Sequence, residues 1–434
     1  MILPPSLLLL AQVLIITASS LLMVLPDANP TLFLFEKLTS LRTSTSTSTS
    51  TSTFSVYPKN RLENKRVWIT GVSSGIGQEI AKQLVQDHDG VKVILSGRRL
   101  NELERVARSC LAPMEQEQES MDVRLAAASG DVDIMDTDSN DNNDNNSSNV
   151  HLLPFDVTNK SEIPDIVDKA LGFYGGIDIL ILNAGVGQLC PALEESYDTT
   201  EHLMRVNFHS PVQLAMEVIR KDKWGKPKQE EEFIGEKSNN VGSLKDHKQI
   251  PEEKKNKRNN NNLKVGHIVV TSSVAAKLPI PLGTSYAASK HATHGYFTSL
   301  RSECHPWLRV DLPSPGPINT KFQTKALYRN EASSNGGEQG ESDDNDGAEV
   351  KMSAERCAKL IIAGMAGPKY LMQETWISKQ PTLFFMFLNQ LFPNFSNFLL
   401  GIIGSLRVKA WNAGLPLYKV SSWIKATKIE NEDQ

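Results

Sequence analysis

The chain has 434 residues, of which 40% are hydrophobic and 22% charged, which is the composition of a globular protein with one large domain or two to three ordinary ones. Its net charge of −4 shows no basic excess and argues against a nucleic-acid partner. The four cysteines are scattered without a CxxC pair or a Cys/His cluster, so we predict free thiols and no metal site.

The N-terminus is dominated by an uncharged apolar stretch, Ile2–Leu25. As a helix it would be about 36 Å long, against about 30 Å for the hydrocarbon core of a bilayer. We therefore predict that residues 1–25 are a membrane anchor, with a cleaved signal peptide or an organelle presequence as alternatives. Residues 26–62, which contain a Ser/Thr-rich repeat, are predicted to be a linker.

Short apolar runs alternate with helical patterns through most of the remaining chain. The strand-like runs are KRVWIT (65–70), VKVILSG (91–97), residues 151–155, GGIDILILNAG (175–185), VGHIVVTSS (265–273) and LRVDLPSPG (308–316). Helical patterns such as those at 78–86 and 202–220 lie between them. Continuous apolar strands alternating with helices are typical of a parallel sheet covered on both faces. We predict an α/β protein with a Rossmann-type doubly wound parallel sheet, in a single catalytic domain at residues 63–325.

Three polar stretches interrupt this alternation, at 112–149, 222–262 and 325–350, and the last is acidic. Each contains too few apolar residues to offset the entropy lost on ordering, so we predict disordered surface insertions. The remaining residues, 351–434, are predicted to form a C-terminal substrate lid or membrane-associated segment.

The first predicted strand runs directly into TGVSSGIG at 70–77, and a helical pattern follows. Glycines permit a tight turn and the close approach of a pyrophosphate, while a helix N-terminus offers free N–H groups. A glycine-rich turn between a strand and a helix in an alternating chain therefore indicates a dinucleotide site. The predicted cofactor contacts in this turn are Gly71, Ser73, Ser74, Gly75, Ile76 and Gly77.

The second predicted strand ends in SGRR at 96–99, where a dinucleotide fold contacts the adenosine ribose. An acidic residue here would bind the 2′-hydroxyl of NAD(H), whereas arginine suits a 2′-phosphate. Arg98 and Arg99 therefore favour NADP(H) as the cofactor. Asp156 and Val157 are assigned to the adenine side, although Asp156 equally suits a helix N-cap.

Further motifs follow in this order: NAG at 183–185, Asn207, Ser273, YAASK at 286–290 and PGPINT at 315–320. With these motifs and TGVSSGIG, the sequence resembles the short-chain dehydrogenase/reductase family. The resemblance covers the predicted catalytic domain apart from its insertions. MSAERCAKLI and ETWISKQP, nearer the C-terminus, resemble one branch of the family. The resemblance implies an NADP-dependent, membrane-associated carbonyl reductase or alcohol dehydrogenase.

The resemblance also implies a role for each matching residue. Tyr286 would be the acid/base and Lys290 its partner. Ser273, in preference to Ser272, would orient the substrate, and Asn207 would complete the catalytic set. The further cofactor contacts implied are Asn183, Ala184, Gly185, Tyr286, Lys290, Pro315, Gly316, Ile318 and Thr320. Leu182, Ser210 and Ala276 depart from the family pattern and put the local turn geometry in doubt.

Tyr286 and Lys290 suit this chemistry on physical grounds as well. Positions i and i+4 share one helix face, so both side chains can point into one cleft. A phenol titrates near about 10, and a nearby ammonium is expected to lower its pKa. In a reduction, Tyr286 would donate a proton to the carbonyl oxygen while Ser273 hydrogen-bonds it. Three nearby histidines are predicted to be surface or packing residues and not metal ligands: His291, His294 and His305.

Residues 381–404 form a second uncharged stretch, rich in aromatic residues. It suits a re-entrant or interfacial membrane segment, a lid over the substrate cleft, or a packed helix pair. The two apolar segments, one near each end of the chain, suggest a lipophilic substrate, such as a sterol, a retinoid or a long-chain ketone or aldehyde. Basic residues follow the N-terminal stretch and none precedes it, which favours a cytosolic catalytic domain, at the endoplasmic reticulum. Lumenal, secretory and plastid locations are the alternatives.

The sequence therefore predicts an NADP(H)-dependent oxidoreductase that interconverts a carbonyl and an alcohol. A 3-ketosphinganine-type or 3-ketoacyl-type reductase of a lipid pathway is one alternative. A catalytically weak NADP-binding scaffold at a membrane is the other. The predicted partners are a small-molecule substrate and a membrane, without nucleic acid, and the resemblance allows a homo-oligomer.

Overall fold

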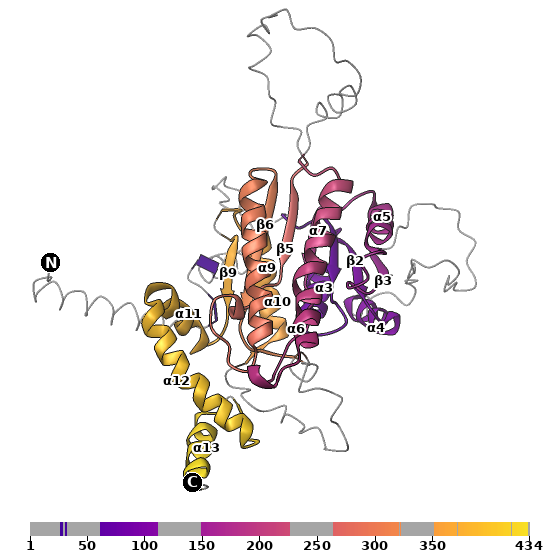
Figure 1. The fold of residues 1–434 in the computed structure, drawn as a ribbon. Helices are drawn as coiled ribbons and strands as arrows, with labels where there is room; N and C mark the ends of the chain where they lie inside the picture. The colour runs from indigo at the N-terminus through magenta and orange to yellow at the C-terminus, as the bar shows by residue number, and fades with distance from the viewer. Residues whose placement is uncertain are drawn as a thin grey trace, which may run out of the picture.

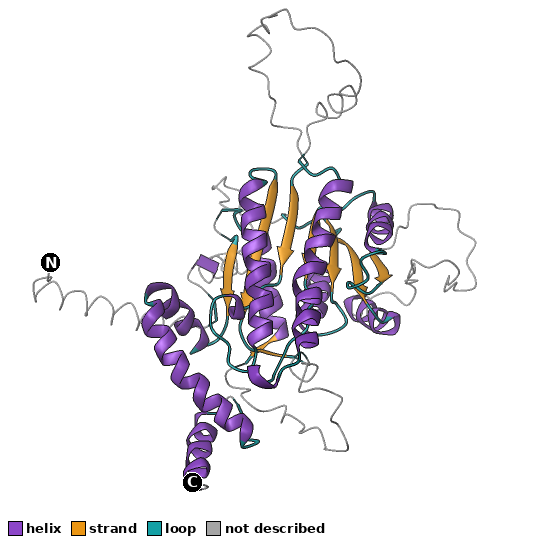
Figure 2. Ribbon diagram, in the orientation of Figure 1, coloured by secondary structure: helices purple, strands orange, loops and turns teal. Residues whose placement is uncertain are grey.

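The structure is a computed structural model of the chain, and it describes residues 27–28, 31–32, 61–111, 149–225, 264–320, 322, 351–370, 372–417 and 419–432. The predicted anchor at 1–25 and nearly all of the predicted linker and insertions lie outside these residues. Helices flank a central sheet on both faces (Figures 1 and 2).

Seven parallel strands make up the central sheet, in the order β3-β2-β1-β4-β5-β6-β9. They are β1 (Arg66–Thr70), β2 (Lys92–Gly97), β3 (Val150–Pro154), β4 (Ile179–Leu182), β5 (Gly266–Val270), β6 (Leu308–Pro315) and β9 (Glu374–Ile377). The predicted Rossmann-type parallel sheet is confirmed. The chain turns from β1 toward β2 on one side and resumes at β4 on the other. Such a reversal of strand order leaves a crevice at the carboxyl ends of the two central strands.

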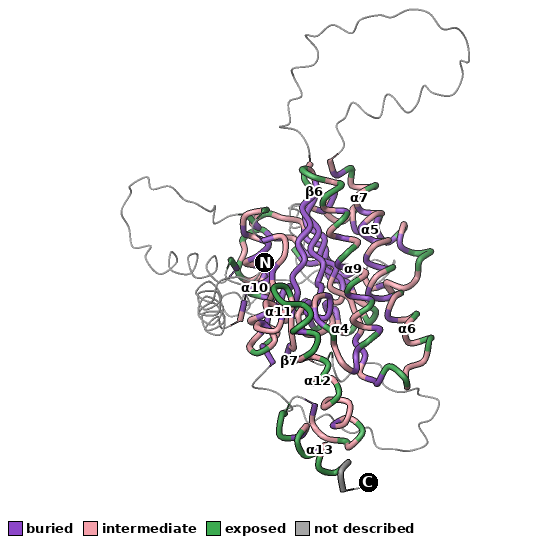
Figure 3. The backbone as a smooth tube through the Cα atoms, turned by 60° about the vertical axis from the view of Figure 1, so that its left-hand side comes forward, coloured by how far each residue is buried: buried purple, intermediate pink, exposed green. Residues whose placement is uncertain are grey.

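Strand side chains alternate between two buried layers, which explains why the strands read as continuous apolar runs. Val67 and Ile69 of β1 belong to the cluster beneath α3 (Gly75–Asp87), α4 (Leu100–Leu111) and α10 (Ala354–Ala366). Trp68, between them, belongs to the opposite cluster with α5 (Ile163–Tyr174), α7 (Ser210–Lys221) and α9 (Thr284–Glu303). In Figure 3 the strands accordingly form the buried centre of the molecule.

The seventh strand comes from residues that the sequence analysis assigned to the C-terminal segment. β9 pairs in parallel with β6, and α10 contributes Leu360 and Ile361 to the same apolar cluster as α3. A short ladder between β7 (Ile318–Asn319) and β8 (Met352–Ser353) joins the two parts again. The sheet domain therefore extends to residue 377, beyond the boundary placed at residue 325.

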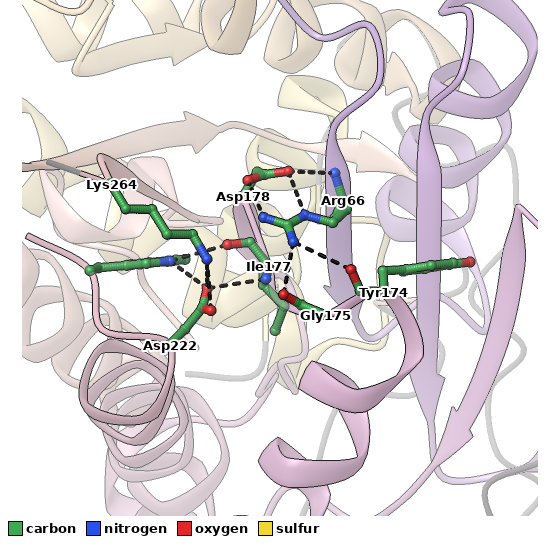
Figure 4. A network of polar contacts seen from close by, with 8 residues as sticks. Arg66, Tyr174, Gly175, Ile177, Asp178, Asp222 and Lys264 are labelled. Atoms are coloured by element: carbon green, nitrogen blue, oxygen red, sulfur yellow. Dashed lines mark hydrogen bonds and ion pairs between the residues drawn. The ribbon is translucent and has the colours of Figure 1, made fainter. Parts of the chain in front are cut away.

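A network of charged side chains closes the amino-terminal end of the sheet (Figure 4). Arg66 binds Asp178 through both carboxylate oxygens, with its Nη2 2.7 Å from Oδ1 and its Nε 2.9 Å from Oδ2. Next to it, Lys264 Nζ lies 2.7 Å from each carboxylate oxygen of Asp222. Gly225 N donates to the Lys264 carbonyl oxygen at 2.9 Å, so residues 225 and 264 are held together at the base of the second predicted insertion.

Three helices follow β9 and project from the sheet domain: α11 (Thr382–Leu391), α12 (Pro393–Asn412) and α13 (Val420–Glu432) (Figures 1 and 3). α13 packs on α12 through Ala426 and Ala410, and Leu282 of the sheet domain joins the same cluster. The second uncharged stretch, 381–404, thus contains a pair of consecutive helices, α11 and the first part of α12. Within the described parts of the chain, no helix combines the length and the apolarity needed to cross a bilayer.

Candidate active site

The glycine-rich turn lies between β1 and α3, at the carboxyl end of the sheet. Gly71 and Gly75 have φ values of +72° and +65°, which side-chain-bearing residues rarely adopt. A Cβ on Gly71 would stand 2.7 Å from Ala184 Cα, and one on Gly77 would stand 2.5 Å from Asn183 Nδ2. The turn is therefore held as close to β4 as a backbone without side chains allows. α3 begins at Gly75 without a side-chain cap on its N–H groups.

Asn183 connects this turn to the neighbouring strand ends. Its Nδ2 donates to the Gly71 carbonyl oxygen at 3.0 Å, and its Oδ1 accepts from Thr271 Oγ1 at 3.1 Å. Thr70 Oγ1 accepts from the backbone N–H groups of Asn183 and Ala184 at 3.2 and 3.3 Å. Asn183 thus ties the glycine-rich turn to the ends of β4 and β5. The sequence analysis did not assign a role to Thr70, the first residue of TGVSSGIG, or to Thr271, which follows β5.

Arg98 and Arg99 follow β2 and are both exposed. Arg99 Nη2 lies 3.7 Å from Glu102 Oε1, a loose surface pair. A Cβ on Gly97 would meet Ser73 Oγ at 2.7 Å, so the end of β2 lies against the glycine-rich turn. Two exposed guanidinium groups therefore stand near a turn suited to phosphate.

Asp156 follows β3 and caps its own turn. Its Oδ1 accepts from both the backbone N and the Oγ1 of Thr158, each at 2.8 Å. Burial would raise the pKa of Asp156, but the bonds from Thr158 and the charge of Arg98 lower it overall. Asp156 is not the N-cap of α5, because that helix begins at Ile163. The neighbouring Val157 packs against the apolar layer under α5.

Tyr286 and Lys290 lie in the first two turns of α9, on one face. Tyr286 is half-buried and Lys290 is buried, with Nζ 5.9 Å from the Tyr286 ring centroid. Lys290 Nζ donates to the Thr271 carbonyl oxygen at 2.9 Å. Phe322 packs edge-on against Tyr286, with 5.9 Å between ring centroids. The structure thus brings together the phenol and the ammonium that the sequence spacing predicts.

The electrostatics of this pair differ from the expectation. Burial raises the pKa of the Tyr286 phenol to about 12, and a hydrogen bond with Ser273 only partly opposes this. Burial lowers the pKa of the Lys290 ammonium to about 8. The predicted lowering of the phenol pKa by Lys290 is therefore wrong for this structure, because desolvation outweighs an ammonium that is directed at a backbone carbonyl. At neutral pH Tyr286 is a protonated acid beside a cationic lysine.

Ser273 lies at the end of β5 and begins the short helix η5 (Val274–Ala276) as its N-cap. Its Oγ accepts from Ala275 N at 3.1 Å and donates to the Pro315 carbonyl oxygen at 3.5 Å. The cap fixes Ser273 Oγ beside Tyr286, with which it is hydrogen-bonded. Ala276, where the family pattern has glycine, is buried in this helix without disturbing the cap.

Asn207 lies in a π-helical turn, η2 (Arg205–His209), between α6 (Tyr197–Met204) and α7. Its amide exchanges two hydrogen bonds with the Val186 backbone, at 2.9 and 3.0 Å, and donates to Ser289 Oγ at 3.0 Å. A Cβ on Gly185 would stand 3.2 Å from Asn207 Oδ1 and 3.7 Å from Lys290 Nζ. Asn207 therefore holds the loop after β4 against α9, next to Lys290. A π-helical turn inside a helix is frequently found at a functional site.

The remaining predicted contacts lie around the same turn. Thr320 is the nearest neighbour of Gly75, whose Cβ would stand 3.1 Å from Thr320 Cγ2. Ile318 is buried in β7, and Gly316 lies directly against Ser378. Ser74 is half-buried and directly precedes α3. Ile76, in the first turn of α3, packs against the apolar cluster beneath that helix. Thr320 and the glycine-rich turn thus lie together at the carboxyl ends of the strands, whereas Ile76 and Ile318 belong to an apolar cluster of the core.

Two further polar side chains support the site, and the sequence analysis gave neither of them this supporting role. Gln188 Oε1 accepts from the backbone N–H groups of Ser285 and Tyr286 at 3.0 and 3.1 Å, and so caps α9 where its preceding Gly283 cannot. His294, predicted to be a packing residue, is buried and contacts Ser272 Oγ through Nδ1 at 3.2 Å. Within the described residues no group of His, Cys, Asp and Glu has the arrangement of a metal site.

Comparisons with known proteins identify the family of the chain. A model of the short chain dehydrogenase family matches residues 65–137, 137–227 and 259–331. The human protein "Dehydrogenase/reductase SDR family member 7" is 28% identical over 378 residues, covering 86% of this chain and 87% of its own length. Its mouse counterpart is 27% identical over 373 residues, with the same coverage.

Solved structures of short-chain dehydrogenases are also similar, at lower identity. One from Burkholderia cenocepacia in complex with NADP is 20% identical, with a TM-score of 0.47, over 74% of this chain and 98% of that one. One from Burkholderia phymatum in complex with NAD is 18% identical, with a TM-score of 0.48, over 82% of this chain and 98% of that one. Because the family model spans more than half of the sequence, the chain belongs to the short-chain dehydrogenase family, a family of oxidoreductases.

Proposed function

We propose that this protein is an NADP(H)-dependent oxidoreductase that interconverts a carbonyl and an alcohol. The observation that carries the proposal is the placement of Tyr286, Lys290 and Ser273 around one point at the carboxyl end of the sheet. The cradle at Gly71 and Gly77, which a Cβ would fill, fits a dinucleotide pyrophosphate. A bound nicotinamide cofactor supplies the hydride that adds to the carbonyl carbon.

The residues of this chain supply the proton and the placement. Tyr286 donates its proton to the carbonyl oxygen as negative charge develops there, and Ser273 hydrogen-bonds the same oxygen. The phenolate that remains is favoured by the Lys290 ammonium, and a proton from solvent restores the phenol. In the oxidation direction the Tyr286 phenolate accepts the alcohol proton. With the phenol pKa near 12, the protonated acid needed for reduction is the resting state at neutral pH.

NADP(H) is proposed over NAD(H) because Arg98 and Arg99 stand exposed at the end of β2. Arginine suits the 2′-phosphate by bidentate hydrogen bonding, and no acidic residue follows the strand at this place to bind a 2′-hydroxyl. Arg105, on the first turns of α4, donates to the Ser73 carbonyl oxygen at 2.9 Å, which adds a third positive charge at this side of the turn.

A lipophilic substrate, such as a sterol, a retinoid or a long-chain ketone or aldehyde, is part of the proposal. Support comes from the helices after β9, which pack on loops next to Tyr286. Leu282 and Leu189 belong to the cluster of α12 and α13, and Cys190 N donates to the Leu282 carbonyl oxygen at 2.8 Å. A location at the endoplasmic reticulum membrane with a cytosolic catalytic domain is proposed on the same grounds.

The two alternative functions make different use of the candidate active site. A 3-ketosphinganine-type or 3-ketoacyl-type reductase uses the same residues on another lipophilic ketone. The alternative of a catalytically weak scaffold rests on Ser210 and Ala276, which stand where the family pattern has glycine. Ser210 is accommodated, since its Oγ donates to the Arg205 carbonyl oxygen at 2.8 Å within the π-helical turn. The reductase is therefore the better-supported reading.

The decisive experiment uses the full chain purified in mild detergent. NADPH oxidation is followed against a panel of lipophilic and hydrophilic carbonyls, with Tyr286→Phe in parallel. Turnover of a lipophilic carbonyl that disappears in the variant supports the proposal. NADPH binding without turnover of any carbonyl, equal in both proteins, would favour the scaffold, and turnover of hydrophilic carbonyls alone would reject the lipophilic substrate.

A further inference from the structure

Large apolar side chains are exposed along one face of α12. Phe395, Phe398 and Ile402 expose 55%, 64% and 48% of their surface. Their spacing of three and four residues places them on one face of the helix. Figure 3 shows α12 and α13 at one end of the molecule, and the exposure of these three side chains means that the described elements leave this face of α12 uncovered.

The same kind of side chain continues on both adjoining helices. The turn between α11 and α12 exposes Leu391 and Phe392. α13 is held on α12 by Ala426, which leaves Val420 and Ile424 exposed. We name the set the apolar face: Leu391, Phe392, Phe395, Phe398, Ile402, Val420 and Ile424. A soluble monomer rarely leaves such a large set of apolar side chains uncovered, so the face indicates an interaction surface.

The charge of this region identifies the occupant. No Asp or Glu occurs between residues 375 and 429, although the whole chain carries a net charge of −4. The basic residues in this interval are Lys379, Arg407, Lys409, Lys419, Lys425 and Lys428. The last three are exposed on or next to α13. The next acidic residues are Glu430 and Glu432, at the end of α13. Exposed apolar side chains flanked by lysines over the preceding positions, 375–429, match the interfacial region of an anionic bilayer.

The attachment of the N-terminal segment is a second, independent observation. Asp27 pairs with Arg356 at 2.6 Å, and its carbonyl oxygen accepts from Ser378 N at 3.1 Å. Ala28 forms an antiparallel bridge with Ile377. Asp27 and Ala28, which follow the uncharged stretch 2–25 in the sequence, are therefore held beside the end of β9, close to the start of α11 at Thr382.

We propose that the apolar face docks into the headgroup and upper acyl region of an anionic lipid bilayer. α12 lies in the membrane plane with Phe395 and Phe398 inserted, and the lysines of α13 contact the lipid phosphates. Apolar area provides the insertion, and the lysines provide electrostatic attraction that increases binding about fivefold for each lysine near an anionic surface. The docking does not depend on the proposed oxidoreductase function.

The test resolves which residues touch lipid, because residues 2–25 alone would keep the full chain on a membrane if they are an anchor. The full chain is reconstituted with phosphatidylcholine vesicles containing phosphatidylserine and a lipid with a photoreactive acyl chain. After irradiation, trypsin digestion and mass spectrometry report lipid adducts for each peptide. The face lies mainly in peptide 380–407, between Lys379 and Arg407.

Acyl-chain adducts are expected on peptide 380–407. The triple variant F395S/F398S/I402S should lower their yield about tenfold. A matched triple variant, L193S/Y197S/V265S, removes apolar side chains elsewhere that are at least as exposed, and it should change nothing. K419E/K425E/K428E should lower the yield only when phosphatidylserine is present. Thermal unfolding checks that each variant is folded.

Three outcomes would overturn the proposal. The first is an absence of lipid adducts on peptide 380–407, whether or not other peptides carry them. The second is a yield unaffected by F395S/F398S/I402S in a folded protein. The third is protein–protein cross-linking through this peptide in place of lipid adducts, which would show that a second copy covers the face.

Discussion

The Glu374 carboxylate on β9 lies 3.6 Å from His294 Nε2 on α9. Its other oxygen lies 2.9 Å from Lys277 Nζ and accepts from Trp376 Nε1 at 3.1 Å. His294 in turn contacts Ser272, so the residues before and after the Ser273 cap are both tied to one carboxylate. A strand beyond the predicted domain boundary thus supports the loop that carries the candidate serine.

Glu374 makes stability depend on pH in a defined direction. Burial would raise the pKa of its carboxyl, but hydrogen bonds from His294, Lys277 and Trp376 hold it well below its ordinary value of about 4.5. The unfolded chain binds the proton more readily, so the stabilisation is complete above the ordinary pKa and is lost progressively as the pH falls below it. Glu374→Gln should lower the free energy of unfolding by about 1–3 kcal/mol at pH 7 and by less at pH 4.

Denaturant unfolding of the two proteins at several pH values measures this difference. Glu355→Gln removes an exposed carboxylate from the first turn of α10 and is the matched control, with little expected change. A constant difference between Glu374→Gln and the parent from pH 7 to pH 4 would contradict the ionic role.

Lys290 is expected to set the alkaline limit of carbonyl reduction. Its ammonium, with a pKa of about 8, favours the Tyr286 phenolate that forms when the proton is transferred. kcat/KM for reduction should therefore fall as the pH rises through about 8. The pH profile of Lys290→Met should be low throughout and lack this falling limb. A wild-type profile that is level from pH 7 to pH 10 would refute the assignment.

Gly77 is expected to be essential for packing of the glycine-rich turn. Gly77→Ala would place a methyl group against the Gly71 carbonyl oxygen and Asn183 Nδ2. The turn must then shift, which should weaken NADPH binding at least about tenfold and lower stability by about 1–3 kcal/mol. Gly172→Ala in α5, where a Cβ meets nothing within 4 Å, should leave binding unchanged and raise stability by up to about 1 kcal/mol. Calorimetric titration with NADPH and thermal unfolding measure both effects, and equal NADPH affinity in the two variants would count against the predicted cradle.

Arg98 and Arg99 are expected to discriminate between the two nicotinamide cofactors. The variant R98A/R99A should raise the dissociation constant for NADPH at least about tenfold and change that for NADH little, because only NADPH carries the 2′-phosphate. Arg108→Ala, which removes an exposed arginine from the other end of α4, is the control. Equal losses for both cofactors would show that the arginines act by general charge alone.

Local sequence patterns were sufficient to predict those parts of the fold that depend on neighbouring residues in the chain. β1, the turn at Gly71 and α3 are contiguous, and their order along the chain is their order in space. Tyr286 and Lys290 share a helix face because the helix repeat places them there. Strands such as β4 and β5 are buried on both faces and therefore read as apolar runs.

Contacts between distant residues could not be predicted in this way. β9 contains Glu374 and Thr375, so it lacks the continuous apolar run of the central strands, and the polar stretch at 325–350 and α10 separate it from β6. Gln188 and Tyr286 are 98 positions apart, and no periodicity relates them. The phenol pKa was predicted in the wrong direction because sequence spacing gives the distance of a charge but not the desolvation around it.

The ion pair between Lys264 and Asp222 has a consequence for protein engineering. It holds together the residues on either side of positions 226–263, at the amino-terminal end of the sheet, whereas Tyr286 lies at the carboxyl end. Once the two ends of a loop are fixed, doubling its length costs only about 0.6 kcal/mol. This position is therefore suited to carry a fluorescent reporter or an affinity module, or to be shortened, without altering the crevice where the dinucleotide is proposed to bind.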